Sequence, residues 1–98
     1  MAHATVRPGD VIETYAFGDE SKTCLAHLIT QGPGSGFPYE VKVYMQDFQP
    51  QYEFQRIKND GRNFGEIGST YTATRSGAWR FAHKTRRRAL KFQRRYNR

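Results

Sequence analysis

The sequence predicts an α+β protein, in which a small antiparallel barrel-like sheet of five or six strands is followed by one long basic amphipathic helix. Runs of β-branched and aromatic residues up to position 74 are interrupted by Gly, Pro or Asn-rich turns at roughly every eight to twelve residues, which favours short antiparallel strands. Residues 76–96 contain no Pro, and their only Gly lies at the start, which favours a helix. The length of 98 residues suits a single domain, with a mainly β body over 1–74.

Turn residues and strand-forming residues predict a first hairpin. Arg7-Pro-Gly-Asp10 is typical of a turn, and it leads into a strand over residues 11–17 that is rich in Val, Ile, Thr, Tyr and Phe. The break at residues 18–21 is followed by residues 23–29, which we expect to form the antiparallel partner.

Alternation of side chains predicts the next strand over residues 39–45. It follows a segment at 31–38 whose Gly and Pro residues favour a mobile surface loop. In the strand, Lys42 and Tyr44 should point to solvent, because the alternate positions are expected to face the core: Tyr39, Val41, Val43 and Met45.

Further strands are predicted over residues 51–57, 62–67 and 69–74. Asn59-Asp-Gly61 between the first two of these segments is a strong signal for a tight hairpin turn. The helix should then start at residue 76, with Ser76 as its N-cap.

Charge is distributed very unevenly along the chain. Residues 75–98 contain ten of the sixteen Lys and Arg residues, and no Asp or Glu follows Glu66. Residues 1–74 therefore carry a formal charge of −3 and residues 75–98 a charge of +10. Concentrated positive charge repels itself unless an anionic partner is present, so this distribution points to a polyanion, an anionic membrane or an acidic protein.

Helical geometry separates the basic side chains from the apolar ones. At 100° per residue, the apolar half of the predicted helix includes Phe81, Ala89, Phe92 and Tyr96, with Arg86 and Gln93 as polar exceptions. Basic residues occupy an opposite arc, here called the cationic face: Arg80, Lys84, Arg87, Arg88, Lys91, Arg94 and Arg95.

The cationic face is typical of proteins that bind nucleic-acid phosphates. Lys and Arg gain affinity there by displacing condensed counterions, and Arg can also bind a phosphate through two hydrogen bonds. We therefore expect a non-enzymatic DNA- or RNA-binding protein with weak sequence specificity. Lys42, Tyr44 and Arg56 are weaker candidates for a second surface, where a ring beside cations could stack on an unpaired base.

Several alternatives fit the same charge distribution. The basic arc could be a solvated helix face, or it could neutralise carboxylates of the body such as Asp10, Glu13, Asp19 and Glu20. It could also bind an acidic protein partner, for example a nucleic-acid enzyme that the chain inhibits. Binding to a membrane surface is a weaker alternative, because the apolar half of the helix is needed for the core. A homodimer would double the cationic area.

Motifs for catalysis, metals or cofactors are weak. Cys24 and His27 are three residues apart, which places them on opposite faces of a strand, so we expect neither a zinc site nor a Cys/His nucleophile. Glu40-Val-Lys42 resembles the Glu-x-Lys element of metal-dependent nucleases, which leaves a small nuclease as a further alternative. We expect no cofactor.

Two remaining features concern the fold type and the compartment. The six residues from Arg7 to Ile12 resemble the turn that opens small SH3-like barrels, and an SH3- or OB-like curved sheet is the expected form. A single cysteine, and the lack of a signal-like N-terminus or an apolar membrane span, predict a cytoplasmic or nucleic-acid-associated protein in a reducing compartment.

Overall fold

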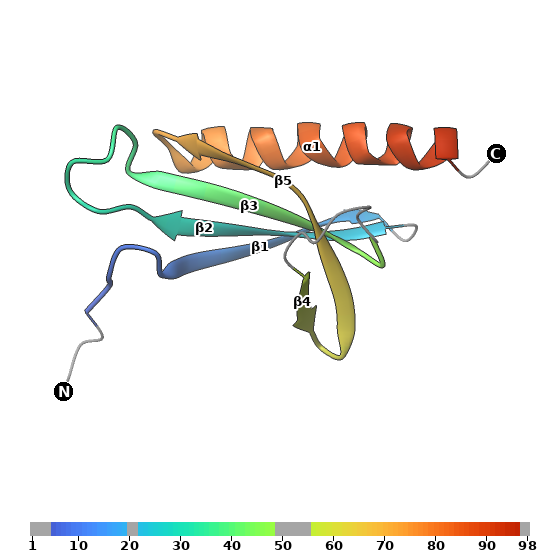
Figure 1. Ribbon diagram of the computed structural model, residues 1–98, viewed down its shortest axis with the longest axis horizontal. Coiled ribbons are helices and arrows are strands. Elements are labelled where there is room, and N and C mark those ends of the chain that lie inside the picture. Colours follow the sequence, from blue (N-terminus) through green and yellow to red (C-terminus); the bar gives the residue numbers. More distant parts are fainter. Residues whose placement is uncertain (1–4, 20–21, 49–55, 97–98) are drawn as a thin grey trace.

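The computed structural model describes residues 5–19, 22–48 and 56–96, with side chains as far as Gln93. The described residues form five antiparallel strands in a curled half-barrel sheet and one C-terminal helix, which confirms the predicted α+β fold (Figure 1). The elements are β1 (Val11–Asp19), β2 (Lys22–Thr30), β3 (Tyr39–Gln46), β4 (Arg56–Asn59), β5 (Arg62–Thr72) and α1 (Arg75–Tyr96).

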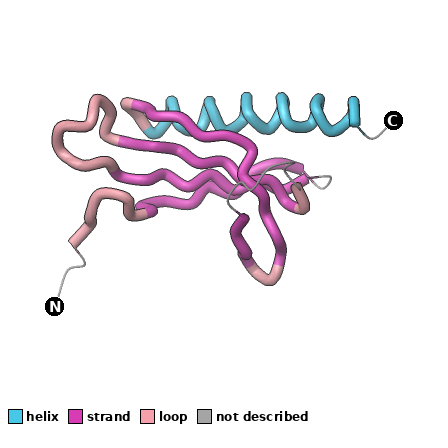
Figure 2. The backbone as a smooth tube through the Cα atoms, viewed as in Figure 1, coloured by secondary structure: helices cyan, strands magenta, loops and turns pink. Residues whose placement is uncertain are grey.

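The strands follow the order β1-β2-β3-β5-β4 across the sheet. The loop over residues 31–38 joins β2 to β3 at one end of the molecule, without taking part in the sheet (Figure 2). In Figure 1 the β4–β5 hairpin curls away from the other strands, on the side opposite α1. The sheet therefore has one side covered by the helix and another side partly enclosed by its own last hairpin.

One predicted division of the chain is wrong, because residues 62–67 and 69–72 belong to the single strand β5, which ends two residues before the predicted segment does. Gly68 does not break the strand but pairs with Val43, and the next pair along the sheet joins Tyr44 to Glu66. This register leaves one extra residue in β5, which is a β-bulge and increases the local curl of the sheet. The predicted strand over 51–57 lies partly outside the described residues, and β4 begins at Arg56.

The tight turn between β4 and β5 is confirmed. Asn59 pairs with Arg62, and the two residues between them have positive φ angles, 51° at Asp60 and 74° at Gly61. Positive φ at both central residues defines the type I′ hairpin turn, which Asp-Gly adopts readily.

The core lies mainly between the sheet and α1. The alternation predicted for β3 is confirmed, since Val41, Val43 and Met45 are fully buried on this side and Tyr39 packs against them. They join Cys24, Ala26 and Leu28 of β2 in one apolar cluster. A second and smaller cluster forms on the other side of the sheet from Leu25, Tyr44 and Phe64, with Ile57 against it.

Small side chains let α1 approach the sheet closely. The buried stripe of the helix consists of Ala78, Ala82, Thr85 and Ala89, which recur at intervals of four and three residues and so lie on one side of the helix. Beneath them Gly68 leaves room for Thr85, since a Cβ atom at Gly68 would stand only 2.9 Å from Thr85 Cγ2. The prediction of a docked helix is thus confirmed.

The helix begins one residue earlier than predicted, and its cap is Thr74. The backbone N–H of Gly77 donates to Thr74 Oγ1 at 3.0 Å, and the N–H of Ala78 donates to the Thr74 carbonyl oxygen at 3.1 Å. The first bond satisfies an N–H group that has no partner within the helix, and the second is the first regular bond of the helix, accepted by the carbonyl of the cap residue. Ser76, the predicted cap, lies inside the first turn.

Candidate nucleic-acid interface

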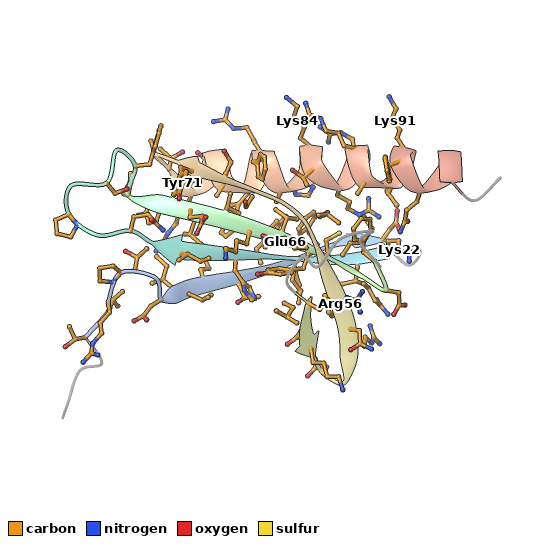
Figure 3. The ribbon with its side chains drawn as sticks, viewed as in Figure 1. Lys22, Arg56, Glu66, Tyr71, Lys84 and Lys91 are labelled. Carbon is orange, nitrogen blue, oxygen red and sulfur yellow. The ribbon has the colours of Figure 1, made fainter. Side chains whose placement is uncertain are left out.

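The described part of the cationic face lies on the solvent side of α1. The stripe of small residues on the opposite side of the helix is buried. All five described side chains of the cationic face are exposed: Arg80, Lys84, Arg87, Arg88 and Lys91. Figure 3 shows Lys84 and Lys91 pointing away from the sheet. The packing of the helix therefore decides which of its sides is left for a partner.

The geometry of α1 sets the size of this surface. At 100° per residue the five side chains fall within an arc of about 100°, and the rise of 1.5 Å per residue places Arg80 and Lys91 about 17 Å apart along the axis. The helix contains no Asp or Glu, so no carboxylate on the same helix can pair with these cations. Arg94 and Arg95 belong to α1, but their side chains lie outside the described ones.

Two basic residues of the helix form ion pairs with the body, although only Arg86 is mostly buried and Arg75 stays largely exposed. Arg75 Nε lies 3.5 Å from Glu13 Oε2 on β1, and Arg86 Nη2 lies 3.1 Å from Asp19 Oδ1. Arg86 also donates to the carbonyl oxygen of Lys22 at 3.1 Å. Glu13 and Asp19, two of the carboxylates that the basic arc could have neutralised, thus pair with Arg75 and Arg86, neither of which belongs to the cationic face.

The sequence marked Arg86 only as a polar exception on the apolar half of the helix. Its side chain is mostly buried because it crosses the end of β1 and β2, beside Cys24. Burial raises the pKa of the Cys24 thiol to about 11, although the nearby Arg86 opposes this effect. Cys24 is therefore a neutral core side chain, and it is poorly suited to act as a nucleophile.

An aromatic cluster supports the start of the cationic face. The hydroxyl of Tyr15 on β1 lies 2.9 Å from His83 Nε2, and the Tyr15 ring stacks on Phe17 with centroids 5.1 Å apart. The ring of Trp79 lies 5.0 Å from that of Tyr15, and the ring of Phe17 lies 4.7 Å from that of His83. These contacts fix the helix against the edge strand, a role that sequence reasoning did not assign to the aromatic residues.

The weaker candidates from the sheet lie apart from the cationic face. Arg56 is exposed on β4, and Figure 3 places it on the hairpin across the sheet from Lys84 and Lys91. Lys42 is half-buried on the side of β3 that faces away from the helix. The structure therefore does not bring Lys42 or Arg56 together with the basic residues of α1.

The expectation that Tyr44 is exposed is wrong. Its ring does point away from the helix, but only 2% of the residue is exposed, because Leu25 and Phe64 pack around it. Burial raises the pKa of Tyr44 above its ordinary value, and Glu66 and Glu40 add to this effect. A buried phenol cannot offer its face to a nucleic-acid base.

His27 packs beside Tyr44 on the same side of the sheet. The two ring centroids are 5.1 Å apart, and burial lowers the pKa of His27, with a further contribution from Lys42. Cys24 lies in the cluster on the helix side, so the predicted separation of Cys24 and His27 is confirmed. Within the described part of the chain, no cluster of three or more His, Cys, Asp or Glu side chains could hold a metal ion.

Phe92 departs from its predicted position in the core. The sequence placed it on the apolar half of the helix, yet 53% of the residue is exposed. In Figure 1 the C-terminal end of α1 extends beyond the ends of β2 and β3, so the sheet gives little cover there. The helical pattern alone could not show where the sheet would end.

Comparisons with known proteins found no match for the chain among protein-family models, curated proteins or solved structures. Among the described residues, no helix combines the length and the apolar character that crossing a membrane requires. The interpretation of the site therefore rests on its geometry and charge.

Proposed function

We propose that the chain is a nucleic-acid-binding protein that contacts phosphates through the cationic face of α1. The observation that carries this proposal is the exposure of five basic side chains on one side of a docked helix that has no carboxylate of its own. A polyanion would relieve their mutual repulsion and release its condensed counterions on binding. No enzymatic step is part of the proposal.

Docking of the helix supports binding by a pre-formed surface. Ala78, Ala82 and Thr85 hold the backbone of α1 against the sheet, and Arg86 ties it to the β1–β2 hairpin. The basic side chains are thus anchored on a rigid element, which lowers the entropy lost when a ligand binds. Contacts of this kind position a nucleic acid without reading its sequence.

A charge-reversal variant tests the proposal. Combining Lys84→Glu, Arg87→Glu and Lys91→Glu should weaken binding to oligonucleotides of any sequence, because three phosphate contacts are lost. In anisotropy titrations over a range of salt concentrations, the slope of log affinity against log salt should fall by about one unit for each lost contact. Unchanged affinity and slope would contradict the proposal.

The β4–β5 hairpin offers a matched control. Arg56→Glu, Lys58→Glu and Arg62→Glu change three exposed cations, so both triple variants lower the formal net charge from +7 to +1. The control variant should retain most of the affinity, because its substitutions lie on the hairpin and not on α1. Equal losses in the two variants would show that net charge, and not the cationic face, determines binding.

An acidic protein remains the other candidate partner for the same surface. Affinity purification from a lysate, with and without nuclease treatment, distinguishes the two. The proposal predicts that the associated material is lost after nuclease treatment. A protein partner would be favoured instead if an acidic protein stays bound to the wild type after treatment but does not bind the charge-reversal variant of the helix.

A further inference from the structure

The exposed ring of Phe92 is the most unusual apolar feature next to the cationic face. It lies one helical turn after Arg88 and directly after Lys91, and all three residues are exposed. Side chains four positions apart lie on the same side of a helix, with Cβ atoms about 5–6 Å apart, so Arg88 and Phe92 are surface neighbours. A large ring thus borders a cluster of cations at the end of α1 that extends past the sheet (Figure 1).

We propose that Phe92 stacks on an unpaired base while Arg88 and Lys91 hold the adjoining phosphates, so that the ligand of this site is single-stranded nucleic acid. This inference rests on the proposed phosphate-binding function and specifies its ligand. Single-stranded nucleic acid carries both the negative charge that complements the cations and exposed base faces that can stack on the ring. Both parts of the site are on the same helix.

A duplex cannot use the ring in the same way. Its bases are stacked on one another and present only their edges in the grooves, whereas unpaired bases can be splayed out onto an aromatic side chain. Duplex binding at this surface would depend on phosphate contacts alone. Phe92 should therefore contribute to the preference for single strands, and the cations to affinity for both forms.

The test compares two ligands of equal length, a deoxythymidine oligonucleotide of about twenty nucleotides and a duplex of about twenty base pairs. Phe92→Ala should weaken binding of the single strand by about five- to a hundredfold, which is the range expected from loss of one stacked base. Duplex affinity should change by less than about twofold, and the salt dependence of both should be retained because no phosphate contact is removed. Equal effects on the two ligands, or no effect on the single strand, would overturn the inference.

Phe37 provides a matched control at the other end of the molecule. It is 47% exposed in the loop between β2 and β3, far from the C-terminal end of α1 (Figures 1 and 2). Phe37→Ala should leave binding of the single strand unchanged. If it weakens binding as much as Phe92→Ala does, stacking at Phe92 is not specific and the inference fails.

A second variant tests the aromatic contact directly. Phe92→Trp should retain the affinity, and its added fluorescence, measured against the wild-type signal of Trp79, should be quenched by the oligonucleotide. Phe92→Leu keeps an apolar side chain but should lose affinity almost as Phe92→Ala does. Full affinity of Phe92→Leu would overturn the stacking inference. The inference would also fail if sedimentation showed that the wild type is a dimer and that Phe92→Ala weakens binding by converting it to a monomer.

The outcomes also separate this inference from the function on which it rests. If the wild-type protein binds neither ligand, the proposed phosphate binding is wrong. If the helix charge reversal weakens binding of both ligands while Phe92→Ala weakens neither, phosphate binding stands and the base-stacking inference alone is wrong.

Discussion

Arg86 Nη2 lies 3.1 Å from Asp19 Oδ1 and 3.1 Å from the carbonyl oxygen of Lys22, so one guanidinium joins α1 to both ends of the β1–β2 turn. Asp19 and Lys22 are the last register pair of that hairpin. Both contacts use the same nitrogen, and the positive charge of the guanidinium strengthens both of them.

Arg86→Ala should lower the free energy of unfolding by about 1–3 kcal/mol, because it removes a mostly buried charged hydrogen bond and leaves the Lys22 carbonyl without this donor. Urea denaturation measures the change. Asp19→Asn should cost less, since the carboxylate is largely exposed and the bond to Lys22 remains. A larger loss in Asp19→Asn than in Arg86→Ala would contradict this account.

Gly68→Ala should be destabilising by about 1–3 kcal/mol, because the new Cβ atom would press against Thr85 Cγ2 in a well-packed interface. Thr85→Ser removes that methyl group and should relieve the clash. A double-mutant cycle measured by thermal or urea unfolding should therefore show that Gly68→Ala costs less in the Thr85→Ser background. Strictly additive effects would mean that the close approach of helix and sheet does not depend on this pair.

Thr74→Ala should lower stability by about 1 kcal/mol through loss of the helix cap, whereas Ser76→Ala, inside the first turn, should have a much smaller effect. Chemical denaturation of the two variants distinguishes the observed cap from the one predicted from sequence. The opposite order of effects would favour Ser76 as the functional cap.

Stability should decrease as the pH falls through the ordinary pKa of His27, because burial lowers the pKa of this residue in the folded state. The unfolded chain then binds a proton more readily than the folded one just below pH 6.5, so the proton favours unfolding. The contribution of one such group cannot exceed about 1.4 kcal/mol for each pH unit.

His27→Gln provides the measurement for that prediction. The free energy of unfolding, followed by urea titration between about pH 7.5 and pH 5.5, should fall less in the variant than in the wild type. Subtracting the two curves removes the contributions of groups that both proteins share. Parallel curves would show that His27 does not cause the pH dependence.

Local sequence patterns predicted much of the fold. Alternation predicted which side of β3 faces the core, Asp60-Gly61 predicted the hairpin turn, and the separation of apolar and basic residues predicted that the helix docks with its basic side outward. Each of these features depends on neighbouring residues or on a regular repeat. Such information is fully contained in a short stretch of chain.

Features that depend on distant segments could not be predicted in the same way. Tyr44 is buried because Phe64, twenty residues later, and the curl of the last hairpin cover it. Phe92 is exposed because the sheet ends before the helix does. Arg86 was visible as an exception on the helix, but its acceptors on the first hairpin become apparent only in three dimensions.

The stripe of small residues on α1 affects how the folded protein should respond to changes in ionic strength. Contacts of Ala78, Ala82 and Ala89 with the sheet are apolar and are not screened by salt, whereas contacts of Lys84 and Lys91 with a polyanion would weaken steeply as salt rises. Salt should therefore release a bound nucleic acid while the folded chain stays intact. Capture and release could then be repeated many times without a cycle of unfolding and refolding.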